Sequence, residues 1–444
     1  MGPNTNSIND YLSPELIWTI FFMNATHEDV TIKERLYNTI SSGLVCKTWR
    51  YLLLDIASIW AHLIYVEHKR RQNDEEIEMM HEILRRSGES PLHVHAILRP
   101  HHSGSAYLDF LDHILSNYWE RIVRLDVRIF VTVREAQETA FLSMLTRPAP
   151  RLRSCHIQLS PSDAPIDQGS DYDIGLSPPL FGNAAPNLRY LRSDHLAISP
   201  QAPWLSTLTT LITTYRTKFT SSIPETLFVL ARLPKLSHLQ LGHHLWEHVP
   251  DLASISTYPS AHLPNLEYFG FGGTAWDCMA LLERVHRPKE CLVNADININ
   301  HDEPEHSEAI AEQLFEQTFS RNLEIKDPLG HRWLFIDIHA QGMGVTLADK
   351  HCFAGTAPTL DFQPIMSSEG SFFSFDFSFL RDVDEDGFCF MNSLFRSTIM
   401  HKVETLRLIA SPFAPDDRRP SMRPLILNTA SVRTLEIDSD PLAH

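Results

Sequence analysis

The chain has 444 residues, of which 38 are Lys or Arg and 55 are Asp or Glu, so its formal charge at pH 7 is −17. Apolar residues make up 43% and charged residues 21%, which is the composition of a folded protein. The length exceeds what one hydrophobic core usually serves, so we expect a multi-part or repetitive architecture. An acidic surface repels phosphate, which argues against nucleic acid as a partner.

The longest mainly apolar run near the N-terminus, Ile17–Met23, is much shorter than the roughly 20 residues that a membrane span needs. No basic region precedes it, so we expect neither a membrane partner nor a secretory signal. The six cysteines lie far apart and no pair has Cys-x-x-Cys spacing. This pattern indicates reduced thiols and predicts a cytoplasmic and/or nuclear protein.

After a flexible tail at residues 1–9, residues 10–66 predict a small helical module. Ser13 can cap the first helix, Pro14 suits the first helical position, and Glu15 complements the helix dipole. Apolar residues then recur at spacings of three and four, which predicts one apolar face. They are Leu16, Ile17, Ile20 and Phe21.

A connecting helix is predicted over residues 67–90, with Ile77, Met80 and Leu84 on one side. From residue 91 to 444 the pattern changes to short strands with apolar residues at the first, fourth and sixth positions. The strands begin at Ile122, Leu152, Leu188, Leu208, Leu236, Leu266, Val403 and Val432, the third and fourth being weaker copies. Helical stretches such as Glu225–Arg232 and Met279–Val285 lie between them.

Most neighbouring strand starts lie 20 to 36 residues apart, which straddles the period of leucine-rich repeats. One strand and one helix per unit, when stacked, give a curved and mainly parallel sheet. The predicted fold class is therefore α/β: a helical module followed by an irregular leucine-rich-repeat-like solenoid. In this register Leu239 and Leu241 face the core, and His238 alternates outward or lies at the strand start.

The regular pattern lapses between residues 290 and 400. Strands are still predicted at Trp333–Ile338 and Phe373–Phe379, and an amphipathic helix at Glu308–Phe319.

Motifs for catalysis or nucleotide binding are missing from the sequence, so we expect neither an enzyme nor a cofactor. The segment Asp382–Gly387 matches the opening of a calcium loop, with oxygen-bearing side chains at positions 1, 3 and 5 and glycine at 6. Position 12 is Ser393, where a bidentate glutamate is required. A solvated acidic turn is the simpler interpretation.

The 24 histidines form two groups close enough in sequence to consider as metal ligands. His243, His244 and His248 could share one side of the chain, and His93 and His95 could share one strand face. Zinc sites usually add cysteine or carboxylate ligands at tight spacing, and none lies nearby in the sequence. We interpret these residues as scattered surface histidines and expect no metal site.

Three stretches of the N-terminal segment resemble an F-box, and they cover about 60 residues. Leu12–Phe21 has the family's Pro-Glu helix start, with Ser13 in place of the usual first proline. Leu44–Leu52 contains the Val-Cys-Lys-x-Trp core, and Ile59–Trp60 matches the closing pair. The later junction Arg85–Leu92 and the repeats themselves are similar to those of the large fungal F-box families with leucine-rich-repeat-like domains.

The resemblance implies a substrate-receptor subunit of an SCF-type (cullin–RING) E3 ubiquitin ligase. Its partners would be a Skp-type adaptor subunit, the cullin scaffold and a protein client that the sequence cannot name. By position, the adaptor-binding residues would be Leu12, Pro14, Glu15, Leu16, Ile20 and Val45. The residues that hold the module together would be Cys46, Trp49, Leu52 and Trp60.

Two alternatives stay open. The helical module could serve only as a cap that closes the N-terminal end of the stacked repeats. Alternatively, the protein could be a non-catalytic interaction scaffold that uses the same repeat surface without ubiquitination.

Overall fold

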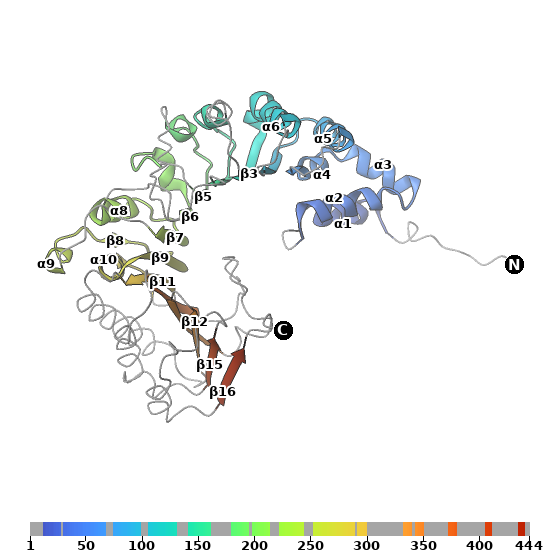
Figure 1. Cartoon of the computed structure of the whole chain (residues 1–444). Helices are drawn as coiled ribbons and strands as arrows, with labels where there is room; N and C mark the ends of the chain where they lie inside the picture. The colour runs from blue at the N-terminus through green and yellow to red at the C-terminus, as the bar shows by residue number, and fades with distance from the viewer. Residues whose placement is uncertain are drawn as a thin grey trace. The chain divides into compact units, whose positions relative to one another are not determined.

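The computed structural model describes most of the N-terminal two thirds of the chain and, beyond it, the residues of five strands (Figure 1). It divides into two compact units, Met1–Leu208 and Thr209–His444, which are treated separately below. The described residues are 12–27, 30–67, 74–98, 105–130, 141–160, 179–194, 198–213, 222–243, 252–288, 291–299, 332–339, 342–349, 372–379, 405–410 and 434–439.

Four helices open the first unit: α1 (Pro14–Thr26), α2 (Ile32–Ser42), α3 (Lys47–Asp55) and α4 (Ala57–Ala61). The Ser13 hydroxyl accepts a hydrogen bond from the backbone N–H of Leu16, which confirms the predicted cap of α1. A reciprocal capping box between Thr31 and Glu34 starts α2. Their shared core holds the buried side chains of Ile17, Phe21, Leu36, Leu53, Ile59 and Trp60.

A parallel sheet completes the first unit. Its strands follow chain order: β1 (Ile64–Glu67), β2 (Leu92–Leu98), β3 (Ile122–Phe130), β4 (Ser154–Ser160) and β5 (Tyr190–Asp194). Parallel neighbours need crossover connections. Helices α5 (Asp74–Arg86) and α6 (Ser105–Tyr118) supply the first two and pack on one face of the strands (Figure 1).

A recurring turn precedes several strands and is built on a Pro-x-Leu sequence. The leucine N–H bonds back to the carbonyl three residues earlier at Leu152, Leu188, Leu236 and Leu266. Where the middle residue is asparagine, its side-chain amide donates to the proline carbonyl of the preceding turn. Asn187 reaches Pro150 at 2.6 Å, and Asn265 reaches Pro234 at 2.9 Å. The repeat in sequence is therefore also a repeat in hydrogen bonding.

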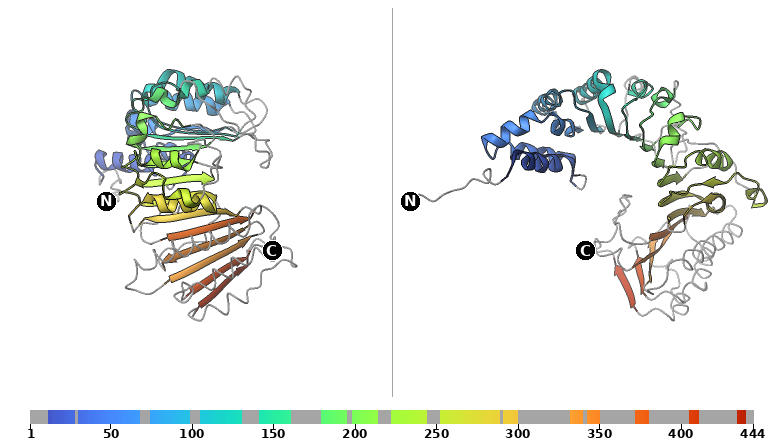
Figure 2. Two further views of the ribbon diagram at one scale, coloured as in Figure 1. Left: turned by 90° about the vertical axis from the view of Figure 1, so that its left-hand side faces the viewer. Right: turned by 180° about the vertical axis from the view of Figure 1, so that it is seen from behind.

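The second unit contains a nine-stranded, mainly parallel sheet, whose strands Figure 2 shows side by side. Strand β13 (Gly342–Asp349) is antiparallel to both of its neighbours, β12 (Arg332–His339) and β14 (Phe372–Phe379). Across the sheet the order is β6 (Thr210–Thr213), β7 (His238–His243), β9 (Tyr268–Thr274), β11 (Leu292–Ile299), β14, β13, β12, β15 (Thr405–Ala410) and β16 (Thr434–Ser439).

In the described part of the second unit, three helices and a small ribbon accompany this sheet. They are α8 (Ile223–Leu230), α9 (Leu252–Ile255), α10 (Ala275–Arg284) and the parallel pair β8 (Ala261–His262) and β10 (Val285–His286). Three short 3-10 turns belong to the first unit: η2 (Trp119–Arg121), η3 (Leu180–Asn183) and η4 (Pro203–Thr207).

The predicted α/β class with a mainly parallel sheet is confirmed, and each of the ten predicted strands corresponds to an observed one. Most begin about two residues after the first apolar position, because that position closes the preceding turn. Leu239 and Leu241 are buried as expected, but His238 is buried too, since its ring stacks on that of Tyr268 at 4.3 Å. His238 is the first residue of β7, which confirms one of its two predicted placements, and the exposure implied by the other is wrong.

Several predictions fall on residues outside the described part of the chain. They are the helix at 308–319, the acidic segment 382–387, His244 and His248.

Candidate functional site

Exposed apolar side chains concentrate on the N-terminal helices. Of the ten large hydrophobic residues that are exposed in the described parts of the chain, nine lie between residues 16 and 54. The tenth is Phe228 on α8. Exposed apolar side chains that gather on one part of a folded protein are typical of a place where something else binds. We call the nine the apolar helical face: Leu16, Trp18, Ile20, Met23, Tyr37, Leu44, Val45, Tyr51 and Leu54.

Helix α1 is apolar on two sides. One stripe, Ile17, Phe21 and Ala25, is buried against the other helices. A second stripe is exposed and follows the same helical spacing: Leu16, Ile20 and Met23. A helix that is apolar all round is normally covered all round. The second stripe of α1 therefore lacks a cover in the described part of the chain.

The turn between α2 and α3 contributes two strongly exposed apolar residues, Leu44 and Val45. Leu44 is 74% exposed and Val45 is 61% exposed. Backbone bonds from Leu44 to Ser41 and from Val45 to Ser42 hold this turn, so the two side chains are presented from an ordered backbone. A backbone that is ordered before binding lowers the entropic cost of binding a partner.

The predicted adaptor-binding residues are nearly all accessible. Pro14, Glu15, Leu16, Ile20 and Val45 are exposed, and Leu12 is half-buried. A hydrogen bond from Ser13 lowers the pKa of Glu15, which keeps a negative charge at the start of α1. The structure thus places five of these residues along α1 and its cap, and Val45 on the turn before α3.

The four residues predicted to hold the module together contribute unequally. Trp60 is buried, and its indole N–H donates to the Leu53 carbonyl at 2.8 Å. Trp49 is half-buried and meets Phe21 edge-on at 5.2 Å. Cys46 caps α3, because its sulfur accepts from the Trp49 N–H. Leu52 is half-buried, and its neighbour Leu53 takes the fully buried position.

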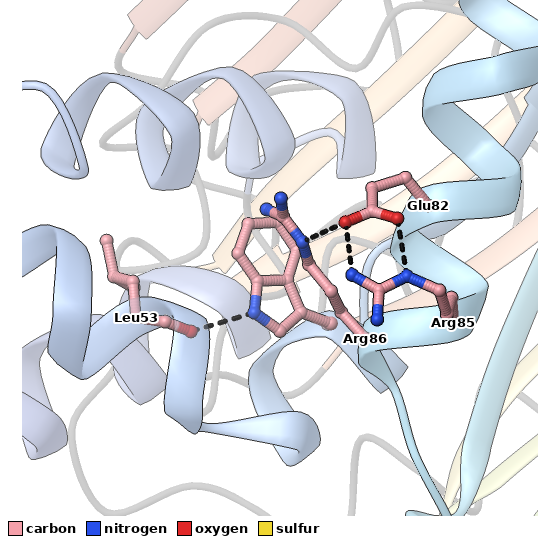
Figure 3. Close-up of polar contacts among 5 residues, drawn as sticks. Leu53, Glu82, Arg85 and Arg86 are labelled. Atoms are coloured by element: carbon pink, nitrogen blue, oxygen red, sulfur yellow. Dashed lines mark hydrogen bonds and ion pairs between the residues drawn. The ribbon is translucent and has the colours of Figure 1, made fainter.

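Trp60 is also the point where the helical module meets α5. The Arg86 guanidinium lies 5.0 Å from the centre of the Trp60 ring, a cation–π distance. The Glu82 carboxylate accepts from Arg86 Nε at 2.8 Å and from Nε and Nη2 of Arg85, each at 2.6 Å (Figure 3). These bonds, above all the one from Arg85, lower the pKa of Glu82 to about 2. Trp60, which ends the F-box-like segment, and Arg86, from the junction Arg85–Leu92, are therefore in contact.

The module also contacts the first strands of the sheet. The rings of His62 and His93 lie 3.9 Å apart, and Lys33 pairs with Glu67 at 4.0 Å. Burial, together with the charges of His62, Arg124 and Arg35, lowers the pKa of His93 to about 3. With these contacts made, the apolar helical face is still exposed. Packing on the sheet therefore does not account for that face.

Six residues of the apolar helical face were not among the adaptor-binding residues predicted from the sequence. Met23 could have been found, because it continues the spacing of Leu16 and Ile20. Tyr51 and Leu54 lie on α3 next to residues that were assigned to the interior, and a pattern of apolar residues alone does not say which of two sides is covered. The other three are Trp18, Tyr37 and Leu44.

No protein-family model matches the chain, and no curated protein matches its sequence. In the described residues we find no helix with the length and apolar character of a membrane span. The same residues contain no group of three His, Cys, Asp or Glu side chains that could hold a metal ion.

Proposed function

We propose that this chain is a substrate-receptor subunit of an SCF-type E3 ubiquitin ligase. In this proposal, α1 to α4 form an F-box that binds a Skp-type adaptor, and the repeats form a leucine-rich-repeat-like solenoid that binds a protein client. The protein catalyses nothing itself. It brings the client to the ubiquitin-charged enzyme that the cullin scaffold carries, and proximity raises the rate of transfer.

One observation carries the proposal: the apolar helical face includes three of the residues that resemble the adaptor-binding positions of an F-box. Leu16, Ile20 and Val45 are each more than half exposed, while Trp60 at the module's closing pair is buried. A module that only capped the repeats has no use for such a face. The hydrogen-bonded Pro-x-Leu turns support the solenoid part of the proposal.

The experiment that tests the proposal is affinity purification of the tagged full chain from cytoplasm and nucleus, the two compartments that we propose. We expect a Skp-type adaptor and a cullin to co-purify. The matched pair of variants is Leu16→Ala and Phe228→Ala, because both remove an exposed apolar side chain. Loss of the adaptor in the first and retention in the second supports the proposal. Absence of adaptor and cullin from the unmodified protein overturns it.

A further inference from the structure

The contact between the helical module and the sheet contains two histidines whose rings face each other. His62 follows α4 directly and precedes β1 by one residue. His93 lies on β2, on the side of the sheet opposite the buried side chains of Leu92 and Val94, because successive side chains of a strand alternate. The two ring centres are 3.9 Å apart, and both residues are half-buried. We call His62 and His93 the histidine pair.

The His62 ring is held in place from several sides. Its Nδ1 lies 2.8 Å from the Ser58 carbonyl of α4. A carbonyl oxygen only accepts, so Nδ1 donates and already carries a proton. Phe22 of α1 meets the His62 ring edge-on at 5.4 Å, and Trp18 stacks on Phe22 at 5.3 Å. Helix α1 therefore reaches β2 through the His62 ring.

The charges that act on the histidine pair are positive. Arg124 is the register partner of His93 on β3, and Arg35 comes from α2. No described carboxylate bonds either imidazole: Glu67 pairs with Lys33, and Asp126 accepts from other histidines. The charged and titratable groups on the elements around the pair are Lys33, Arg35, Tyr65, Glu67, His95, Arg124 and Asp126.

Protonation therefore opposes this contact. Two imidazolium rings at this separation repel each other, and the two guanidinium groups add to the repulsion. Burial, together with these positive charges, lowers the pKa of both histidines, to about 3 at His93, and the bond to Ser58 opposes the shift at His62 only in part. An imidazole released to water has a pKa of about 6.5.

The sign of the pH dependence follows from this difference. The separated rings bind protons more readily than the packed rings, so falling pH favours separation. The contact has its full stability above about pH 7 and loses it as pH falls below about 6.5. For each histidine, every further pH unit multiplies the ratio of open to closed contact about ten-fold, until the lowered pKa is reached.

We infer that the histidine pair is an acid-sensitive contact, which holds α1 and the start of β1 against β2 at neutral pH and releases them in weakly acidic solution. The inference concerns how the helical module is attached to the sheet, and it goes beyond the proposed function. It stands whether or not α1 binds an adaptor.

The test is hydrogen exchange of the full-length chain between pH 7.5 and pH 5.5, followed by mass spectrometry. Exchange in β1 reports the contact, because only Leu63 separates His62 from this strand and β1 is the end strand of the sheet. After correction for intrinsic exchange, the opening equilibrium of β1 should rise about ten-fold or more over this range. Helix α8 should show no such rise. An opening equilibrium of β1 within two-fold at both pH values overturns the inference, and this includes the case in which the rings turn into solvent without releasing the strand.

Variants assign the effect to the histidine pair. His93→Phe keeps a ring for stacking but takes up no proton, so only the smaller rise due to His62 should remain. The double variant His62→Gln with His93→Phe should abolish the rise. His93→Gln is a second replacement for the case in which phenylalanine does not fit, and the same loss of pH dependence is expected. His286→Gln removes an exposed histidine from β10 and should keep the full rise. A full rise in the double variant, or an equal loss in His286→Gln, overturns the assignment.

Failure here is separable from failure of the proposed function. His93→Phe should leave adaptor binding at pH 7.5 intact, and Leu16→Ala should leave the pH dependence of exchange in β1 intact. If the adaptor binds but exchange in β1 does not respond to pH, the inference is wrong while the proposed function stands.

Discussion

Replacing Leu16 and Ile20 together by alanine should weaken adaptor binding without unfolding the protein. Complete burial of a Leu or Ile side chain is worth about 1.5–3 kcal/mol. Leu16 is 53% exposed and Ile20 is 51% exposed, so about half of that burial is left for a partner to complete. The two truncations together should then cost about 1.5–3 kcal/mol, or roughly a ten- to hundred-fold loss of affinity.

The assay is isothermal titration calorimetry of a purified Skp-type adaptor into the full chain. Phe228→Ala is the matched control, because it removes a side chain that is 55% exposed on another helix. Unfolding of the double variant, followed by circular dichroism, should change by no more than about 0.5 kcal/mol, since the truncated atoms are already in water. An adaptor affinity within two-fold of that of the unmodified protein would refute the reasoning, whether or not the stability of the double variant changes.

Three further predictions concern stability and turnover. Burial raises the pKa of Asp277 to about 6, so its ionised form opposes folding and the stability of the protein falls as pH rises through 6. Asp277→Asn should therefore stabilise the protein by about 1–3 kcal/mol at pH 8 and by almost nothing at pH 4. Thermal melts of both proteins at the two pH values test this. Leu239→Asp should unfold its repeat, because it buries an unpaired charge. His238→Asp should also destabilise the repeat, by about 1–3 kcal/mol, because the His238 ring stacks on Tyr268. Denaturant melts in which the His238 variant is as stable as the unmodified protein would contradict the stacking argument. In cells, the adaptor-binding double variant should hold clients yet lengthen their half-lives, whereas unchanged half-lives of all bound proteins would favour a scaffold without ubiquitination.

The double variant is a cleaner tool than deletion of residues 1–66. Strand β1 ends at Glu67 and pairs with β2, so that deletion would remove most of a strand from the sheet. Strand β2 would keep its pairing with β3 but lose its pairing with β1, so effects on client binding could not be separated from effects on folding.

The strands could be predicted from the sequence because each repeat presents its apolar residues at fixed spacing after a Pro-x-Leu turn. Strand β2 was suggested only by the pair His93 and His95 and was not counted among the repeat strands, although Leu92, Val94, Ala96 and Leu98 alternate along it. Strand β1 was missed because it has only four residues and follows helices directly. A repeated spacing of apolar residues therefore predicts the strands of the repeats, but it does not predict a strand whose pattern occurs only once.

The candidate site was predictable in part, for a related reason. Spacing predicted a single apolar face on α1, and this was wrong, because Ile17 and Phe21 are buried whereas Leu16 and Ile20 are exposed. The resemblance to a family suggested that Leu16 and Ile20 face a partner. The hydrogen bonds from His95 and His156 to Asp126 could not be predicted, because the three residues lie about 30 positions apart in the chain and meet only through strand register. Register depends on where each preceding turn ends, which short-range patterns do not fix.

The contact between Arg86 and Trp60 has a mechanical consequence. It fastens the helical module to α5, and α5 packs against β1, so a force applied to the module reaches the sheet through closely packed side chains rather than through a slack tether. In a receptor of the proposed kind, this joint limits the radius that the ubiquitin-charged enzyme can sweep around a bound client. Lysines of the client inside that radius would be modified, and lysines outside it spared. Loosening the joint with Arg86→Ala would then widen the set of modified lysines without changing which client is bound.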